Sequence, residues 1–286
     1  MQRAFGVDIG GTKIRAAIVS ADGQIAAFCV VPTPKTAEHV AAAIDAMITG
    51  LDDGTAAAIG IGVPGRVDAA AGKIFSGGFV DLSGMSFAAS LTQAKSRRVV
   101  IGNDAAMALV AEARVGAAKG LAHVVLLTIG TGIGGAIMMG GRIMHGRATA
   151  GQLGHMTVDI NGLPCLCGRR GCLETTSSGT ALGRLISAAG LPPATTAGDL
   201  LRREDETAKT ILRDWVQPLR AGIDSLVAAF DPQRVVLGGG LGAAAARALA
   251  EFPAVSPWYQ CEVVAASLDD DAGVIGAALA SLEPPP

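Results

Sequence analysis

The chain has 286 residues, which is enough for two lobes that each bury a core of their own. Half of the residues are hydrophobic but only 3% are aromatic, so the core must be aliphatic and a ligand pocket must rely on hydrogen bonds more than on ring stacking. The net charge of −2 and the absence of a long basic run argue against a nucleic-acid or membrane surface, and every apolar run ends before the roughly 20 residues that span a bilayer.

The first 116 residues alternate strands with helices, a pattern typical of an α/β lobe. Three short apolar runs open the chain as an antiparallel meander, in which Asp22 and Gly23 turn the second strand into the third. Strands are expected at 3–9, 14–20, 24–31, 56–63 and 99–101, and helices at 36–49, 86–95 and 104–115.

The pattern restarts after residues 116–120, and we place the lobe boundary there. A strand, a glycine loop and a second strand begin each lobe, which indicates two related lobes facing each other across a cleft. The second lobe is expected to contain strands at 123–129, 136–139 and 234–237 and helices at 179–189 and 205–230, whereas the last helix, at 273–281, is long enough to cross back and pack on the first lobe. The predicted domains are an N-terminal α/β lobe at 1–116, completed by the last helix at about 272–286, and a C-terminal α/β lobe with a zinc loop at 117–271.

Residues 150–174 carry three of the five cysteines and a histidine. Three thiolates and an imidazole within eighteen residues match a closed tetrahedral zinc site, and the glycines and proline around them supply turns. A site whose four positions are all filled by protein is structural, so the zinc would hold a loop whose side chains Gln152, His155 and Glu174 face a substrate. The alternative is three unrelated thiols beside a buried histidine. The predicted zinc ligands are His155, Cys165, Cys167 and Cys172.

The cysteines also bear on the compartment. As metal ligands or buried thiols they suit a reducing environment, and we expect Cys29 and Cys261 to be core thiols. The first residues lead into a strand without a charged and apolar leader, so a cytoplasmic protein is expected. The charge pattern then predicts small-molecule partners, with no nucleic acid and no membrane.

Three glycine-rich turns are typical of phosphate and nucleotide binding. Asp8 ends a strand beside two glycines, a hydroxyl and an ammonium, so that backbone N–H groups could approach phosphate while the carboxylate holds Mg²⁺ through water. The loop 130–135 exposes amides in the second lobe, and the run 238–240 would let an adenosine lie on bare backbone at a helix N-terminus. Each also fits a plain hairpin or a strand-to-helix turn. The candidate nucleotide-binding residues are Asp8, Gly10, Gly11, Thr12, Lys13, Gly130, Thr131, Gly132, Gly134, Gly238, Gly239 and Gly240.

Asn103 and Asp104 follow a strand and open a helix. Both residue types are preferred at helix N-caps, so a capping pair is one interpretation. The other makes Asp104 a general base that accepts a hydroxyl proton as the oxygen attacks phosphorus. Both can hold for neighbouring residues.

Six motifs follow one another along nearly the whole chain: DIGGTK from Asp8, GVPGRVD from Gly62, ND at 103 and 104, GTGIGG from Gly130, GH with CxCGxxGC ending in LE at Glu174, and LGGG from Leu237. Together they resemble the ROK family, whose name covers repressors, open reading frames and kinases, and which belongs to the hexokinase and actin-like superfamily. The resemblance implies a two-lobed α/β fold of the actin-like, ribonuclease H-like ATPase type with an interlobe cleft, and a homodimer.

The resemblance to the kinases of this family also implies roles for individual residues. Asp104 corresponds to the base, and the two phosphate loops correspond to residues 8–13 and 130–135. His155 would bind zinc through one ring nitrogen and the sugar through the other, which couples the metal to substrate affinity. Arg66 is included because it resembles a residue of N-acetylmannosamine kinases. The candidate sugar-binding residues are Gly65, Arg66, Asn103, Asp104, Gln152, His155 and Glu174.

The chain departs from the family pattern in three places. Gln152 stands where the family usually has glutamate, and its NH₂ donates where a carboxylate would accept, so the preferred substituents at the first two sugar carbons could differ; a near-isosteric swap with little effect is the alternative. The loop 76–81 lacks the Asn-Leu-Pro that many members carry near the sugar, and Ala136 replaces a frequent third glycine. These departures concern the substrate more than the fold.

The resemblance thus predicts an ATP-dependent kinase that transfers a phosphoryl group to a hexose or N-acetylhexosamine, at O6, with ATP, Mg²⁺ and a structural Zn²⁺. One alternative is a sugar-responsive regulator, although Asp8 leaves no room before it for the helix-turn-helix of the family's repressors. Another is a sugar-binding protein that has lost catalysis. Glucose, N-acetylmannosamine, N-acetylglucosamine, allose and fructose all stay open as substrates.

Overall fold

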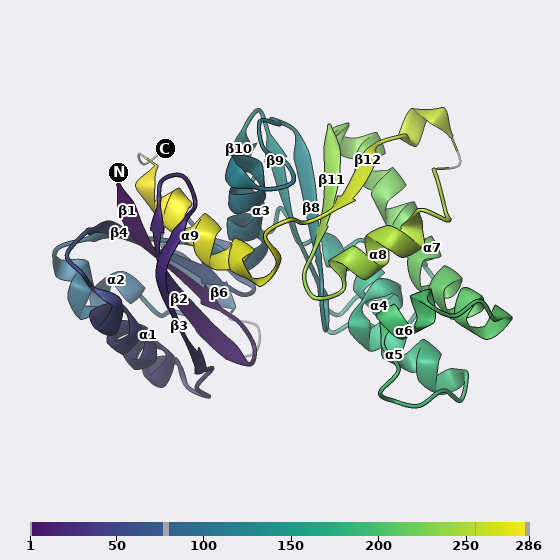
Figure 1. Ribbon diagram of the computed structural model, residues 1–286, viewed down its shortest axis with the longest axis horizontal. Coiled ribbons are helices and arrows are strands. Elements are labelled where there is room, and N and C mark those ends of the chain that lie inside the picture. Colours follow the sequence, from purple (N-terminus) through teal and green to yellow (C-terminus); the bar gives the residue numbers. More distant parts are fainter. Residues whose placement is uncertain (1, 77–79, 255, 284–286) are drawn as a thin grey trace. The chain divides into compact units, whose positions relative to one another are not determined.

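The computed structural model describes residues 2–76, 80–254 and 256–283, which form two compact α/β units (Figure 1). The first unit takes the described residues of Met1–Gly120, Ile143–Ala150 and Asp270–Pro286; the second takes Leu121–Arg142 and Gly151–Asp269. The α/β class is therefore confirmed, while the interlobe cleft stays a prediction. Among the described residues, none of the helices has both the length and the apolar character needed to cross a membrane.

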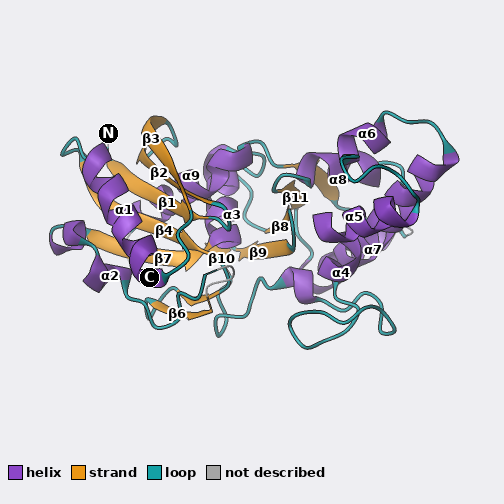
Figure 2. Ribbon diagram, turned by 90° about the horizontal axis from the view of Figure 1, so that it is seen from below, coloured by secondary structure: helices purple, strands orange, loops and turns teal. Residues whose placement is uncertain are grey.

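A five-stranded sheet in the order β3-β2-β1-β4-β7 forms the centre of the first unit. β1 runs antiparallel to β2 and parallel to β4. Because successive side chains of a strand point to opposite faces, Phe5, Val7 and Ile9 enter a core with α1, while Gly6 and Asp8 face the other side. Figure 2 shows α1 lying across the strands of this sheet. The elements are β1 Arg3–Ile9, β2 Lys13–Ser20, β3 Ile25–Pro32, α1 Ala37–Leu51, β4 Ala56–Val63, β5 Arg66–Asp68, β6 Lys73–Ser76, β7 Arg98–Asn103 and α3 Asp104–Val115.

The last helix, α9 (Ala272–Leu282), covers the second face of this sheet and packs on β1, β4 and α3 (Figure 1, yellow). Glycines make the approach close enough for backbone contact. A Cβ on Gly6 would lie 1.9 Å from the carbonyl oxygen of Val274, and one on Gly60 would lie 1.8 Å from that of Ala277. The C-terminal helix is therefore an integral layer of the first unit.

The second unit repeats the strand order of the first, as β10-β9-β8-β11-β12. β8 pairs antiparallel with β9 and parallel with β11, and its residues Val125, Leu127 and Ile129 share a core with α7 and its buried Trp215. The elements are β8 Val124–Ile129, β9 Ile133–Met139, β10 Arg142–Ile143, α4 Leu173–Ser177, α5 Gly179–Ala188, α6 Ala197–Leu201, α7 Glu206–Phe230, β11 Arg234–Gly238, α8 Gly242–Leu249 and β12 Glu262–Ala265.

Three details differ from the sequence predictions. The segment Ile143–Ala150, predicted in the C-terminal lobe, belongs to the first unit. The helix predicted at 86–95 breaks at Leu91 into α2 (Phe87–Ser90) and a 3₁₀ turn. β9 begins at Ile133 and not at 136, because three residues of the predicted glycine loop, Ile133, Gly134 and Gly135, pair with β8.

Candidate functional site

The sequence left open whether Asn103 and Asp104 cap a helix, and in the structure Asn103 is the residue that does so. Asn103 is the N-cap of α3, since its side-chain oxygen accepts the amide of Ala106 at 3.1 Å, and its Nδ2 donates to the carbonyl of Gly65 at 2.9 Å. Nδ2 also donates to Oδ1 of Asp104 at 2.8 Å, and the same Oδ1 accepts the amide of Ala105 at 2.8 Å. Within the described part of the chain, Oδ2 of Asp104 accepts no hydrogen bond. One oxygen of this carboxyl is thus fixed and the other is available.

The carboxyl of Asp104 is partly buried, and burial raises its pKa to about 6. The hydrogen bonds from Ala105 and Asn103 act in the opposite direction and lower the pKa. A carboxylate with a pKa near 6 is ionised at neutral pH and is still a better proton acceptor than an exposed aspartate. These are the properties of a general base.

Asp8 lies at the end of β1 on the face that α9 covers. Its carboxyl sits between two glycines: a Cβ added to Gly62 would lie 3.4 Å from it, and one added to Gly273, in the first turn of α9, would lie 2.6 Å from it. Burial and the charge of Asp104 raise the pKa of Asp8 to about 7, while Arg15 lowers it. The raised pKa means that the charged carboxylate is disfavoured at this buried position. A nearby cation would stabilise the charged form, which suits the predicted magnesium role.

The sequence reasoning missed Arg15, which lies directly opposite Asp8 in the β1–β2 pair. Its guanidinium donates to Asp270 at 2.8 Å and to Asp271 at 2.7 Å, just before α9 begins. The hairpin spacing could have revealed the pairing with Asp8, because a short turn at 10–12 fixes the register. No motif in the sequence indicated that Asp270 and Asp271 would accept hydrogen bonds from Arg15.

The first glycine turn is a tight hairpin, as the plain alternative proposed. The amide of Gly10 donates to the carbonyl of Lys13 at 3.0 Å, and Thr33 holds the turn by donating its hydroxyl to the Gly10 carbonyl at 2.6 Å. The amides of Gly11 and Thr12 donate to no partner among the described residues. A hairpin geometry and an anion-binding role are thus compatible for these two amides.

The second glycine turn, residues 130–132 between β8 and β9, has its carbonyls occupied and two of its amides unoccupied. Gly130 O accepts Gly179 N at 2.8 Å, Thr131 O accepts the hydroxyl of Thr180 at 2.8 Å, and Gly132 O accepts Gly130 N at 2.9 Å. Among the described residues, the amides of Thr131 and Gly132 donate to none. Carbonyl oxygens that point into the protein leave a turn whose free N–H groups suit an anion.

The run 238–240 packs against this same turn. Gly238 ends β11 opposite Thr128, and Gly239, at φ 75°, lies so close to β8 that a Cβ would meet the carbonyl oxygen of Ile129 at 2.6 Å. The amide of Leu241 donates to the carbonyl of Ile129 at 2.9 Å. The structure therefore brings two of the three predicted nucleotide elements together within the second unit.

Gly134 and Gly135 lie in β9, opposite Thr128 and Leu127, and so are not part of a loop. Gly135 makes room for the segment that contains Gln152 and His155, since a Cβ there would meet Leu153 at 2.8 Å. Gly154 approaches β9 in the same way, with its missing Cβ 2.0 Å from the carbonyl oxygen of Ile133. These glycines serve close packing of the candidate sugar segment onto the strand.

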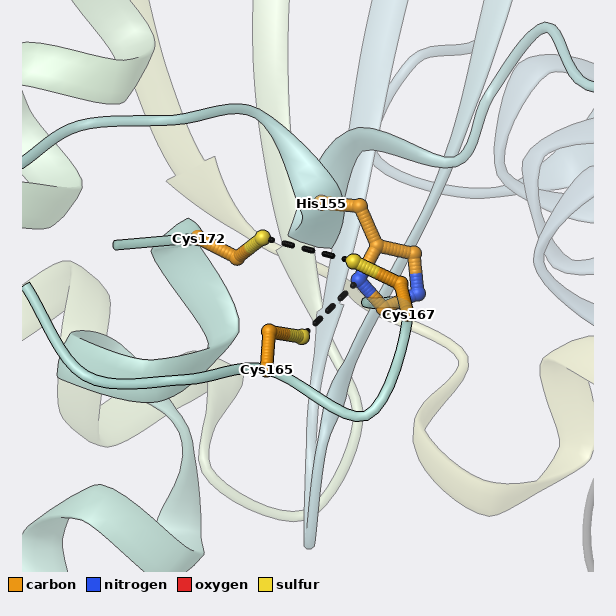
Figure 3. Close-up of side chains that lie close together, drawn as sticks. All are labelled: His155, Cys165, Cys167 and Cys172. Atoms are coloured by element: carbon orange, nitrogen blue, oxygen red, sulfur yellow. Dashed lines mark hydrogen bonds between the residues drawn. The ribbon is translucent and has the colours of Figure 1, made fainter. Parts of the chain in front are cut away.

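The four predicted zinc ligands converge, with donor atoms that all lie within 4.8 Å of one another (Figure 3). His155 Nδ1 lies 3.5 Å from Cys165 Sγ, and Cys167 Sγ lies 3.6 Å from Cys172 Sγ. Ligands about 2.3 Å from a tetrahedral zinc lie about 3.8 Å apart, so these spacings and the donor set fit the ion. The turns between the cysteines are held by backbone hydrogen bonds such as Cys165 N to Arg169 O at 2.8 Å.

Glu174 lies in the first turn of α4, two residues after the zinc ligand Cys172, which is the N-cap of that helix. Its Oε2 accepts the amide of Ile133 at 2.9 Å. Gln152 precedes the 3₁₀ turn of His155, and its carbonyl accepts the amide of His155 at 3.1 Å. The zinc loop, α4 and the glycine turn are therefore contiguous within the second unit.

Gly65 and Arg66 lie between β4 and β6 in the first unit. Gly65 has φ 90°, and a Cβ there would lie 2.4 Å from the carbonyl oxygen of Ser76, so only glycine fits. Arg66 is exposed and stacks over the ring of Phe75 at 5.3 Å. Part of the loop that lacks Asn-Leu-Pro, residues 77–79, lies outside the described residues.

Comparison with known proteins identifies the class. The profile of the ROK family matches residues 4–283, which is nearly the full length, and the chain therefore belongs to the ROK family. This confirms the resemblance carried by the six sequence motifs.

Several similar proteins are named as sugar kinases. The chain is 33% identical to a glucokinase of Thermotoga maritima over 96% of each chain, and 31% identical to an N-acetylmannosamine kinase of Haemophilus influenzae over 96% of this chain and 94% of the other. Among solved structures, a ROK family glucokinase from Streptomyces griseus in complex with glucose and AMPPNP is similar with a TM-score of 0.81 and 32% identity, covering 96% of this chain and 98% of that one.

Proposed function

We propose that this protein is an ATP-dependent sugar kinase that transfers the γ-phosphoryl group of ATP to O6 of a hexose or N-acetylhexosamine. The observation that carries the proposal is the geometry of Asp104. Its Oδ1 is fixed by two hydrogen bonds, its Oδ2 is available within the described part of the chain, and burial raises its pKa to about 6.

Each group in the first unit has a defined task in this reaction. Oδ2 of Asp104 accepts the proton of the sugar hydroxyl as the oxygen attacks the γ-phosphorus, and ADP leaves with the electrons of the broken P–O bond. Asn103 keeps the carboxylate oriented through its bond to Oδ1. Mg²⁺, when bound, neutralises charge on the phosphates, and Asp8 is the residue that would hold it through water.

The second unit supplies the remaining contacts of the proposal. The amides of Thr131 and Gly132 would bind phosphate oxygens, and the glycines 238–240 would accept the adenosine. His155 turns Nδ1 toward the sulfur of Cys165 (Figure 3), which leaves Nε2 for a sugar hydroxyl. The zinc would hold this ring in place and take no part in the transfer.

The comparisons support a sugar as the acceptor, since relatives that match over nearly the full length are named for glucose and for N-acetylmannosamine. Gln152 would bear on the choice between sugars. It makes no side-chain cap in its 3₁₀ turn, so its amide can both donate to and accept from the sugar.

The test is a coupled assay of ADP release from magnesium-ATP over glucose, mannose, fructose, allose and the N-acetylhexosamines. The native protein and Asp104→Asn are compared, because asparagine keeps an oxygen for the Ala105 amide but cannot take the proton. Release that depends on one sugar and is lost in the variant supports the proposal. Folded, zinc-loaded protein that releases no ADP with any sugar would favour a regulatory or binding role instead.

A further inference from the structure

Glu174 has a contact that sugar binding does not require. Its Oε2 accepts the backbone amide of Ile133 at 2.9 Å, immediately after the turn 130–132. The approach is so close that a Cβ on Gly132 would lie 2.3 Å from the same oxygen. The carboxylate therefore occupies the space that any other residue at position 132 would fill.

The turn beside this contact is held almost wholly through its carbonyl groups. At the start of α5, the amide of Gly179 donates to the carbonyl of Gly130, and the hydroxyl of Thr180 donates to the carbonyl of Thr131. The carbonyl of Ile129 accepts the amide of Leu241. Glu174 alone, among the described side chains, accepts a hydrogen bond from an amide of the residues 130–133. It thus holds the end of the turn that lies next to the unbonded amides of Thr131 and Gly132.

We propose that Glu174 is a positioning residue for the nucleotide as well as a sugar ligand: its bond to Ile133 holds the glycine turn in the conformation that binds phosphate. The inference rests on the proposed function for its nucleotide, but the contact itself does not. A charge-assisted hydrogen bond to a partly buried amide is stronger than a neutral one, so its loss should loosen the turn.

The same contact links the metal loop to the nucleotide. Glu174 follows the zinc ligand Cys172 by two residues, and the amide of Leu173 between them donates to the carbonyl of Met156 at 2.8 Å, next to His155. The position of the Glu174 carboxylate is therefore set by the zinc loop. A short chain of bonds runs from the metal ligands to the turn 130–132.

The experiment compares Glu174→Ala and Glu174→Gln by calorimetric ADP binding without sugar and by hydrogen exchange of the segment 129–135. The alanine variant should bind ADP about tenfold more weakly, the size of one charge-assisted hydrogen bond, and should exchange the Ile133 amide faster. Glutamine keeps an oxygen that can accept this amide, so it should restore both properties while sugar binding stays impaired. Glu262→Ala is the matched control, because Glu262 pairs with Arg234 in the same unit and lies outside the site.

Native ADP affinity and unchanged exchange in a folded Glu174→Ala protein would overturn the proposal and leave Glu174 with the sugar alone. If that variant does not fold, Gly132→Ala provides the second test, since its Cβ must displace the carboxylate from Ile133 without removing a sugar ligand. Neither readout needs turnover. A protein that phosphorylates no sugar would thus refute the kinase proposal, while the exchange of Ile133 would still decide this one.

Discussion

Asp104 combines a place in the first turn of a helix with a partly buried carboxyl, two features that push its proton affinity in opposite directions. The hydrogen bonds from Ala105 and Asn103 lower its pKa, but burial outweighs them and raises it to about 6. The deprotonated form is the base, so the rate of phosphoryl transfer should rise with pH through about 6 and level off above it. A pH profile of kcat with the preferred sugar checks this limb.

Replacing Asp104 with asparagine removes the proposed base and should slow phosphoryl transfer. Asp104→Asn should reduce kcat by about 100- to 10,000-fold, the usual contribution of a general base, with little change in the unfolding temperature because the capping bonds persist. Glu262→Ala removes an unrelated carboxylate and is the control. A loss of kcat in this control as large as in Asp104→Asn, at pH 5 or at pH 8, would contradict the assignment. A native profile without an acidic limb near 6 would do the same.

Asp8 permits a stability prediction whose sign follows from its raised pKa. The folded state holds a proton on Asp8 up to about pH 7, whereas an aspartate in the unfolded chain releases it near the ordinary pKa of 3.8. Raising the pH across this window therefore destabilises the metal-free protein. Asp8→Asn should be as stable as the native protein near pH 4 and more stable near pH 8, measured by urea unfolding without magnesium. A difference that shrinks toward high pH would refute burial of Asp8 as the cause.

At the level of single residues, the sequence identified the carboxylates, the glycines and the zinc ligands by type and spacing. It did not assign Gly134 and Gly135 to a strand, because a run of glycines is typical of a loop and carries no alternation of apolar side chains, whereas both residues pair with β8. Arg15 was missed for a different reason: its acceptors Asp270 and Asp271 lie more than 250 residues away in sequence. Contacts of this kind leave no local periodicity.

Among the elements, α9 depends on glycines that let backbone touch backbone. Gly60→Ala should cost about 1–3 kcal/mol or more, because its Cβ would lie 1.8 Å from the carbonyl oxygen of Ala277 and must push the helix away. Gly50→Ala is the matched control in the same unit. It lies in α1 with nothing within 4 Å of the new Cβ, so it should stabilise by about 0.5–1 kcal/mol. Urea unfolding midpoints compare the two, and similar effects of both variants would contradict the packing argument.

The zinc loop is an element without regular structure, and its order should depend on the metal. We expect one zinc per chain by elemental analysis, released by a strong chelator or by Cys165→Ser, with a lower melting temperature and weaker sugar binding. Cys29→Ser is the control, because Cys29 lies on β3 in the first unit. Purified protein without zinc, or full zinc retention in Cys165→Ser, would be incompatible with a site made of these four ligands.

Element positions were largely predictable where apolar runs met clear stop signals. The strands at 3–9 and 56–63 and the helix at 104–115 were predicted at the bounds that the structure shows. The helix expected at 86–95 fails at Leu91, whose backbone is extended at ψ 131°, so tertiary packing overrides the local helical pattern. Short elements such as β10 and α4 contain too few residues for a periodicity to show.

For the whole molecule, the repeated pattern of strand, glycine turn and strand correctly indicated two related units, since both sheets have the same strand order. The excursion of Ile143–Ala150 into the first unit had no such pattern, because it is set by what the segment contacts and not by its own composition. ROK membership, read from the motifs, extends over residues 4–283. That the segment Ile143–Ala150 belongs to the same unit as the first 120 residues could be seen only in the structure.

The return of α9 to the first sheet has a consequence for the order in which the protein can be made. β1, β4 and α3 are synthesised long before residues 272–282, so the glycine-lined face of the first sheet stays uncovered until those residues have been made. The second unit, apart from its early strands, is synthesised without that dependence. During synthesis, the first unit should therefore complete its fold only after the second unit has been made, when α9 covers β1 and β4.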